Sequence, residues 1–321
     1  MAKVRWGFIG AGMVATKALY PALMNSEVGE IYAVASRDIE RAKKISPTGL
    51  VYSNYQSLLD DKNVEAIYIS LPNSLHTPWS IKAIQAGKHV ICEKPLALNA
   101  AEVQSAIAAH DQTNLLFMEA SWNRWHPRTV RIKELVDSGA IGNLKSIHTA
   151  FTYGGLSNDN IRLKPKLGGG ALYDLGPYSA AAPLWLMNFA PHRDVATQVK
   201  WHASGTDETV LTTFMIGSVR VETLTSMNMS ATNYFKIKGE NGSIITGGKD
   251  AFSSHKKPST LEVTIAGKKN KEYFDACDPY QLMIDAFSRR VRGKEGWLMP
   301  LSESLAFAQL FDEIFNSMRT T

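Results

Sequence analysis

Short apolar segments alternate with amphipathic ones over the first 120 residues. The apolar segments have the length of buried strands and cover residues 4–11, 30–36, 66–71, 89–92 and 115–120. Apolar positions at helical spacing fill much of the sequence between them, at residues 14–24, 77–86 and 100–110. Strands that alternate with helices at these lengths predict a parallel sheet covered by helices on both faces.

The pattern changes after a predicted amphipathic helix at residues 128–138. Apolar and polar positions then alternate in strand-length segments at residues 144–153, 195–203, 209–215, 218–226, 233–238 and 261–266. Helical spacing returns at residues 178–187, 279–291 and 303–318. Because turns join most of these strands, they predict a large, mostly antiparallel open sheet. We therefore expect two domains, at residues 1–120 and 121–321. Packing of the last helix back on the first domain is the alternative for that segment.

The composition is that of a globular protein without membrane segments. The chain has 321 residues, 45% of them hydrophobic and 20% charged, which is enough for two cores. No window approaches the roughly 18 uncharged apolar residues of a membrane span. Cys92 and Cys277 are too few for a disulfide framework, so a cytoplasmic location is expected. The net charge of +5 comes from scattered Lys and Arg side chains, which favours a solvated basic surface over a nucleic-acid site.

A glycine-rich turn joins the first predicted strand to the first predicted helix. Residues 10–15 read Gly-Ala-Gly-Met-Val-Ala, which is the pattern G-x-G-x-x-A. Gly10 permits a tight turn, Gly12 lets the backbone approach a pyrophosphate, and Ala15 lets the helix pack closely on the sheet. The first domain is therefore predicted to be a Rossmann dinucleotide-binding domain, which gives an α/β plus α+β protein. Its first cofactor contacts are expected to be Gly10, Gly12, Met13 and Ala15.

The end of the second predicted strand bears on the choice of cofactor. NAD enzymes usually carry an acid here, which binds the ribose 2′-hydroxyl. This chain has Ser36 followed by Arg37, and a guanidinium group binds a 2′-phosphate in a fork. We predict that Ser36 and Arg37 bind NADP, with NAD as the alternative cofactor, and that Asp38 caps the next helix.

Two polar segments follow the predicted strands at 66–71 and 89–92. Because open α/β sheets bind ligands at the carboxyl ends of their strands, both segments are expected at the cofactor. Lys94 in the second segment can polarise a substrate oxygen as hydride moves, and Glu93 can orient it. A surface ion pair between the two is the structural alternative. His76 is expected either to contact the nicotinamide or to cap its helix. The expected cofactor contacts in these segments are Leu71, Pro72, Asn73, His76, Glu93 and Lys94.

Three glycines precede an acid and a tyrosine in the second half of the chain. Asp174 and Tyr178 lie four residues apart, so they share one face if this part is helical. A tyrosine hydroxyl beside a cation can give or take a proton, which makes Tyr178 a candidate acid–base. The alternative is a half-buried aromatic ring with a satisfied hydroxyl.

Six motifs, in their order along the chain, resemble the Gfo/Idh/MocA oxidoreductase family. They are GAGMVA, SR, LPNSLHTPW, AGKHVICEKPLAL, EASWNRWHP and NIRLKPKLGGGALYDLGPY. The resemblance covers nearly the whole chain. It is strongest to the branch of NADP-dependent D-xylose dehydrogenase, dimeric dihydrodiol dehydrogenase and glucose–fructose oxidoreductase. A tyrosine at position 178 fits that branch, whereas inositol-dehydrogenase-like members usually have a histidine. The resemblance implies metal-independent hydride transfer between NADP and a hydroxyl or carbonyl group of a sugar-like molecule.

The resemblance also implies roles for individual residues. Lys94 matches the lysine of the family's EKP motif, and Tyr178 matches its catalytic acid–base. Contact with the substrate, or support of the pocket, is implied for Asp174, Arg124, His126 and Arg162. The family further implies a cis peptide between Lys94 and Pro95. It also implies a homodimer or higher oligomer formed through the sheet of the second domain.

Other functions stay open on the sequence alone. Within enzymes they are trans-dihydrodiol oxidation and reduction of a ketosugar or dicarbonyl. A non-catalytic dinucleotide sensor is the alternative of another class, and the presence of both Lys94 and Tyr178 argues against it. A zinc site is disfavoured because His76, His89 and His126 lie in different segments without Cys/His spacing.

Overall fold

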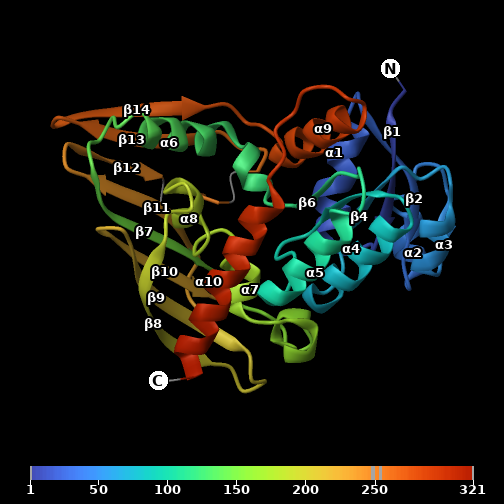
Figure 1. Ribbon diagram of the computed structural model, residues 1–321, viewed down its shortest axis with the longest axis horizontal. Helices are drawn as coiled ribbons and strands as arrows, with labels where there is room; N and C mark the ends of the chain where they lie inside the picture. Colours follow the sequence, from blue (N-terminus) through green and yellow to red (C-terminus); the bar gives the residue numbers. More distant parts are fainter. Residues whose placement is uncertain (1, 247–249, 253–254, 320–321) are drawn as a thin grey trace. The chain divides into compact units, whose positions relative to one another are not determined.

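The computed structural model describes residues 2–246, 250–252 and 255–319. The chain divides into two compact units, each built on its own sheet. The first contains Met1–Trp122 and Asp278–Leu305, and the second contains Asn123–Cys277 and Ala306–Thr321. Figure 1 labels their helices and strands. Among the described residues, no helix combines the length and the apolar character that a membrane crossing requires.

A six-stranded parallel sheet forms the centre of the first unit, in the order β3-β2-β1-β4-β5-β6. Its strands are β1 (Val4–Ile9), β2 (Gly29–Ala35), β3 (Val51–Tyr52), β4 (Ala66–Ile69), β5 (His89–Cys92) and β6 (Phe117–Glu119). All residues of β4 are buried, and so are all but one in β1. Burial at consecutive positions is expected where helices cover both faces, so the predicted parallel sheet is confirmed.

The helices of the first unit include one that returns from far along the chain. They are η1 (Ala15–Leu19), α1 (Tyr20–Met24), α2 (Ile39–Lys43), α3 (Tyr55–Asp60), η2 (Asn73–Leu75), α4 (His76–Gln85), α5 (Ala100–His110), α9 (Pro279–Val291) and the first turn of α10 (Leu301–Arg319). The predicted helix at 14–24 begins as the π-helical η1 and continues as α1. Pro21 lacks an N–H, which removes one α-helical hydrogen bond at this junction. Helix α9 packs against α1 and β2.

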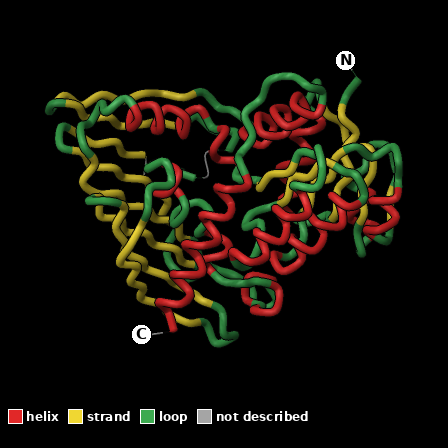
Figure 2. The backbone as a smooth tube through the Cα atoms, viewed as in Figure 1, coloured by secondary structure: helices red, strands yellow, loops and turns green. Residues whose placement is uncertain are grey.

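An eight-stranded sheet forms the second unit, in the order β14-β13-β12-β11-β7-β10-β9-β8. Its strands, yellow in Figure 2, are β7 (Leu144–Thr152), β8 (His192–Trp201), β9 (Asp207–Ile216), β10 (Val219–Ser226), β11 (Thr232–Gly239), β12 (Gly242–Thr246), β13 (Ser259–Ile265) and β14 (Lys268–Phe274). Strands β7 and β10 pair in parallel and the other neighbours are antiparallel. The predicted, mostly antiparallel sheet is therefore confirmed.

Short helices accompany this sheet. They are η3 (Trp122–Trp125), which spans the boundary between the units, α6 (Pro127–Asp137), η4 (Ile161–Leu163), η5 (Pro165–Leu167), α7 (Ala171–Leu175), α8 (Ala182–Leu186) and the rest of α10. Helix α7 contacts β9 and β10, and α6 contacts β13. Buried and half-buried residues alternate strictly along β9 from Val210 to Ile216. One face of the sheet is therefore covered more completely than the other.

Three features differ from the sequence prediction. Strand β14 reads KKNKEYF and has no apolar alternation to reveal it, because it is an edge strand with mostly exposed side chains. Strands β3 and β12, which are short, were also not predicted. The predicted helix at 178–187 contracts to α8, and residues 176–181 form turns.

Candidate active site

The strand ends of the first unit bring the predicted cofactor segments to one edge of its sheet. Ile9 is the register partner of both Ala35 and Ile69. Ile69 in turn pairs with Cys92, which pairs with Glu119. The segments that begin at residues 10, 36, 70, 93 and 120 therefore leave the sheet side by side. This is the edge at which open α/β sheets bind nucleotides.

Gly10 is required by a close approach of two loops at this edge. Its φ is +97°, and a Cβ atom built on it would lie 2.4 Å from the carbonyl oxygen of Ser70. A Cβ atom built on Gly12 would lie 3.4 Å from the Ser70 hydroxyl oxygen, which is an ordinary van der Waals contact. Ala15 is fully buried at the start of η1. Met13 is 59% exposed, so its side chain is open to a ligand. Gly10 therefore has the tight turn that was predicted for it.

Ser36 and Arg37 follow β2. Ser36 is buried, and its Oγ accepts a hydrogen bond from the Asp38 N–H at 3.1 Å. Asp38 caps α2 by accepting the Arg41 N–H at 3.0 Å, as predicted. Arg37 is exposed, and the exposed Arg41 guanidinium lies 3.0 Å from the Asp38 carboxylate. Two guanidinium groups thus lie in this segment, and only that of Arg37 was predicted from the sequence to bind the cofactor.

His76 joins two of the predicted cofactor segments. It is the first residue of α4 and is 1% exposed. Its Nδ1 lies 2.7 Å from the carbonyl oxygen of Pro95, and its Nε2 lies 2.8 Å from that of Leu71. Burial lowers the pKa of His76, and a neutral ring donates from one nitrogen only. His76 therefore ties the loop after β4 to the loop after β5. Pro72 and Asn73, which precede it, are half-buried.

Glu93 and Lys94 are held from within the first unit. Glu93 is 6% exposed, and its Oε1 accepts a short hydrogen bond from the Tyr68 hydroxyl. Its Oε2 accepts the backbone N–H of Lys94 at 3.3 Å. Glu93 is thus a buried anchor of the loop, which differs from the surface ion pair considered as an alternative. The Lys94–Pro95 peptide is cis, as the resemblance implied.

A second polar cluster lies in the other unit and includes two predicted substrate residues. The Arg162 Nε lies 2.9 Å from Asp174 Oδ2, and the Tyr153 hydroxyl donates to the same oxygen at 2.7 Å. Burial raises the pKa of Tyr153, and the Asp174 charge adds to the effect. Tyr153 therefore stays protonated and acts as a donor. Sequence reasoning missed Tyr153, because a tyrosine at the end of a strand has no motif around it.

Gly170, the last of the three glycines before α7, makes room for a buried acid that was also missed. Asp207 Oδ2 accepts the Leu172 N–H at 2.7 Å, at the start of α7. Gly170 has a φ of +132°, and a Cβ atom there would lie 2.0 Å from Asp207 Oδ1. Burial raises the pKa of Asp207 to about 7, against the backbone hydrogen bonds that lower it. Asp207 thus fixes the start of the helix that carries Asp174.

Tyr178 lies just beyond α7, in a turn. The helix ends at Leu175, so the shared helical face expected for Asp174 and Tyr178 is not formed. The Tyr178 N–H instead donates to the Leu175 carbonyl at 3.0 Å. The ring is 7% exposed and packs edge-on against Phe151, with centroids 5.4 Å apart. The side chain is therefore well fixed.

Arg124 and His126 contact other parts of the second unit. The Arg124 guanidinium lies over the Trp185 ring, 4.7 Å from its centroid. His126 is 2% exposed and caps α6, where its Nδ1 accepts the Arg128 N–H at 3.1 Å. These contacts hold both side chains against other parts of the second unit.

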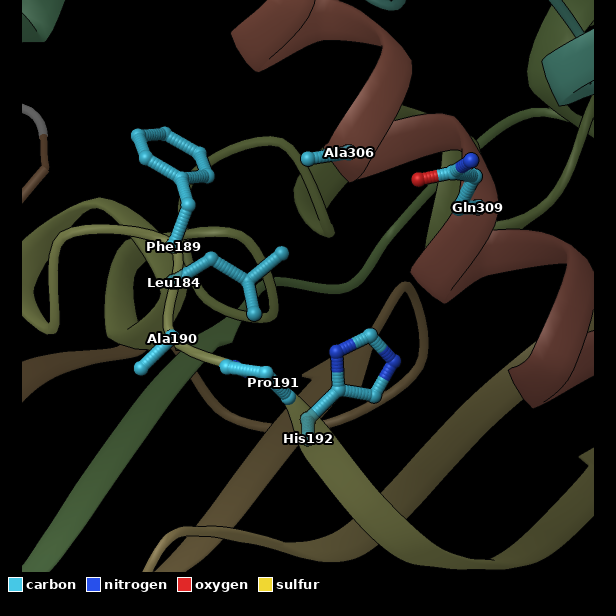
Figure 3. Close-up of a pocket in the computed structure, with 7 residues that line it drawn as sticks. All are labelled: Leu184, Phe189, Ala190, Pro191, His192, Ala306 and Gln309. Carbon is cyan, nitrogen blue, oxygen red and sulfur yellow. The ribbon is translucent and has the colours of Figure 1, made fainter.

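Two further observations concern other kinds of site. Over residues 2–246, 250–252 and 255–319, no group of three or more His, Cys, Asp or Glu side chains could hold a metal ion. A cavity of about 260 Å³ lies in the second unit (Figure 3). The segment from α8 to β8 lines one side of it, and Ala306 and Gln309 of α10 line the other. None of the predicted site residues lines this cavity.

Comparison with known proteins identifies the family. An oxidoreductase family model with an NAD-binding Rossmann fold matches residues 4–121, and a GFO/IDH/MocA C-terminal domain model matches residues 129–245. The chain belongs to the Gfo/Idh/MocA oxidoreductase family. The predicted family and fold class are therefore confirmed.

Several Gfo/Idh/MocA members resemble the chain over almost its whole length. D-xylose 1-dehydrogenase (NADP(+)) 2 from Haloferax volcanii is 32% identical, over 98% of this chain and 97% of that protein. Trans-1,2-dihydrobenzene-1,2-diol dehydrogenase from Xenopus laevis is 28% identical over 98% of each. The structure of a 3-ketoreductase from Actinomadura kijaniata, in complex with NADP and TDP-benzene, matches with a TM-score of 0.91, 26% identity and 98% coverage of each chain. The predictions of an oxidoreductase and of NADP as its cofactor are confirmed.

Proposed function

We propose that the chain transfers a hydride between NADP and a carbon that bears a hydroxyl or carbonyl group in a sugar or sugar-like molecule. The observation that carries this proposal is the alignment of strand ends in the first unit. It brings the Gly10 turn, the Ser36–Arg37 segment and the Lys94 loop to one edge of the sheet. The relatives that act on D-xylose and on a dihydrodiol support the choice of substrate class.

We propose that Lys94 and Tyr178 handle the oxygen and the proton. NADP, when bound, accepts or supplies the hydride. During oxidation the substrate loses a C–H hydride and an O–H proton, and a carbonyl forms. Negative charge grows on the oxygen as the proton leaves, so the Lys94 ammonium stabilises the transition state more than the ground state. Tyr178 accepts the proton and passes it to solvent, and it returns a proton in the reverse direction.

Asp174 is the proposed binding group for substrate hydroxyls. Its pairing with Arg162 fixes the position of the carboxylate. Tyr153 adds a second fixed donor to the same oxygen. A carboxylate held in this way accepts hydrogen bonds from a polyol without first losing freedom of its own. Arg124 and His126 support the pocket walls in this proposal.

The test compares Lys94→Ala and Tyr178→Phe with the same substitutions at a lysine and a tyrosine outside the proposed site. Each substitution is expected to lower kcat by roughly 10²–10³-fold, because it removes one group that acts on the reacting oxygen. NADPH affinity is expected to stay the same, since the pyrophosphate and 2′-phosphate are held elsewhere. Aldoses, ketoses and diols are screened with both cofactors at the nicotinamide absorbance.

The controls are Lys82→Ala, whose ammonium lies over Trp79, and Tyr173→Phe, whose ring packs on Phe315. Both are expected to turn over at the wild-type rate. Near wild-type turnover by Lys94→Ala or Tyr178→Phe would contradict the proposed roles. A dihydrodiol as the only substrate found would favour the second candidate, which the Xenopus laevis relative supports.

We also propose a homodimer through the less covered face of the second unit's sheet. Leu211 pairs with Leu224, which pairs with Ala150, which pairs with Tyr234. These four residues form an apolar row across four strands, and all but Ala150 are half-buried in the single chain. Burial of this apolar row by a second copy of the chain is favourable, because it removes apolar surface from water.

We also propose a cytoplasmic location, which is expected because the chain has only two cysteines.

A further inference from the structure

The turn of residues 94–96, which carries Lys94, is held by side chains from several elements of the first unit. Glu93 accepts the backbone N–H of residue 94 at 3.3 Å. His76 contacts the carbonyl oxygen of residue 95 at 2.7 Å, and Thr77 donates to that of residue 96 at 3.1 Å. The N–H of residue 96 donates to the carboxyl group of Glu119. Four main-chain polar groups of one short turn are thus bound by side chains.

Glu119 is the one of these four side chains that comes from β6. It is the last residue of β6, pairs in register with Cys92, and is 3% exposed. Ser304, in the first turn of α10, lies near enough to lower the pKa of its carboxyl group. The charged and titratable groups that face it are Lys94, Glu93 and Cys92, from the end of β5 and the turn that follows.

We propose that Glu119 is a positioning residue for the reaction, which holds the turn that carries Lys94 through the Leu96 N–H and couples its own charge to the Lys94 ammonium. This inference rests on the proposed role of Lys94. Glu119 and Glu93 are both buried, and two buried carboxylates destabilise each other because their negative charges repel. The positive charge of Lys94 offsets part of this repulsion.

The electrostatics of the site agree with this geometry. Burial raises the pKa of Glu119 to about 7, the contacts with Ser304 and Leu96 lower it, the charge of Lys94 lowers it further, and the charge of Glu93 raises it. Glu119 therefore changes its charge near neutral pH, beside the proposed catalytic lysine. Removal of the lysine charge is expected to raise the pKa of Glu119 again.

Infrared spectroscopy of the full chain tests the coupling without any substrate. The C=O stretch of protonated carboxyl groups is followed between about pH 5 and 9, and the Glu119 band is assigned by its loss in Glu119→Gln. We expect its midpoint to rise by about one pH unit in Lys94→Ala. The buried Asp207, assigned in the same way with Asp207→Asn, is the matched control. Its pKa is also about 7, and no lysine is among its causes, so its midpoint is expected to stay fixed. An unchanged Glu119 midpoint in Lys94→Ala would overturn the inference.

Turnover then separates positioning from simple loss of stability. Glu119→Leu removes the acceptor for the Leu96 N–H and is expected to lower kcat roughly 10–100-fold with NADPH affinity unchanged. Glu119→Gln keeps an acceptor oxygen for the Leu96 N–H, so its kcat is expected to lie close to that of the wild type. The wild-type kcat is expected to change near pH 7 as Glu119 titrates, and this change should be absent in Glu119→Gln. A Glu119→Gln profile that keeps this change would contradict the inference. Full turnover by Lys94→Ala would instead contradict the proposed function, whatever the infrared midpoints show.

Discussion

At the scale of single residues, the cofactor preference is expected to depend on two arginine side chains near Asp38. Arg37 is exposed, and Arg41 is paired with the Asp38 carboxylate at 3.0 Å. A guanidinium group that is already paired with a carboxylate has fewer N–H donors and less net positive charge available for a phosphate. Arg37 is therefore expected to contribute more to the binding of the NADP 2′-phosphate than Arg41 does.

Replacement of Arg37 by Ala is expected to weaken NADPH binding about 10–100-fold, because charge-assisted hydrogen bonds contribute roughly 1.5–3 kcal/mol. NADH lacks the phosphate, so its affinity should change by less than about twofold. Fluorescence titration of each nucleotide with the wild type and the variant measures both. Equal losses for NADPH and NADH would show that Arg37 acts on something other than the 2′-phosphate.

Asp207 gives a residue-scale prediction about pH. Its pKa is raised to about 7 in the folded chain, whereas an aspartate in an unfolded chain titrates near 4. Between those values the unfolded chain has lost the proton and the folded chain still holds it, so the free energy of unfolding falls as pH rises. Asp207→Asn removes this dependence. Relative to wild type, the variant should gain up to about 4 kcal/mol between pH 4 and 8.

Denaturant unfolding at several pH values measures this difference. The Asn amide still accepts the Leu172 N–H through its oxygen, and any cost of its NH₂ group is independent of pH. A stability difference that stays constant from pH 4 to 8 would contradict the prediction.

At the scale of elements, the glycine turn before α7 is a rigid part of the second polar cluster. Gly168 and Gly170 both have positive φ, and a Cβ atom on Gly169 would lie 2.4 Å from the Arg162 carbonyl oxygen. Arg162 and Asp174 pair across this turn. The conformation of the turn therefore determines how the pair is held.

Gly170→Ala is expected to destabilise the chain by at least about 2 kcal/mol, because its backbone conformation is available almost only to glycine and its Cβ atom meets Asp207. Gly155→Ala is the matched control: its φ is +83° but nothing lies within 4 Å of its Cβ position. The control should lose only about 1 kcal/mol. Thermal or denaturant unfolding of both variants gives the comparison, and equal losses would show that the contact with Asp207 does not matter.

The elements that the sequence predicted are those with strong patterns. The long helix α9 has apolar positions at helical spacing, and the short apolar run of β4 is recognised as a buried strand by its length and its β-branched and aromatic residues. Strand β14 could not be found in this way, because an edge strand exposes most of its side chains. Motifs pointed to Lys94 and Tyr178. Glu119 opens the quoted EASWNRWHP motif, but its contact with Leu96, like that of Asp207 with Leu172, joins residues that are distant in sequence. Contacts of that kind follow from the fold and leave no local signal.

At the scale of the whole molecule, the apolar row on the second unit's sheet predicts the state of association. Light scattering should give twice the chain mass of 35.4 kDa, or a higher multiple. The double substitution of Leu211 and Leu224 by Lys introduces charges on two paired strands and should yield monomers. NADPH binding serves as the control, since the first unit is unchanged. A wild-type monomer at micromolar concentration would contradict the proposed dimer.

The return of Asp278–Leu305 to the first unit affects how this unit folds during synthesis. Trp6 in β1 donates to Ser288 at 3.1 Å and packs on Phe287, and Arg292 pairs with Glu65 at 2.7 Å. A ribosome adds roughly 5–20 residues per second, so Trp6 waits roughly 15–60 s for its partners in α9 to be synthesised. The whole second sheet is synthesised during that interval. During synthesis, the apolar surface of the nucleotide-binding unit around Trp6 therefore stays uncovered until α9 is made. The unit reaches its final form only as synthesis ends.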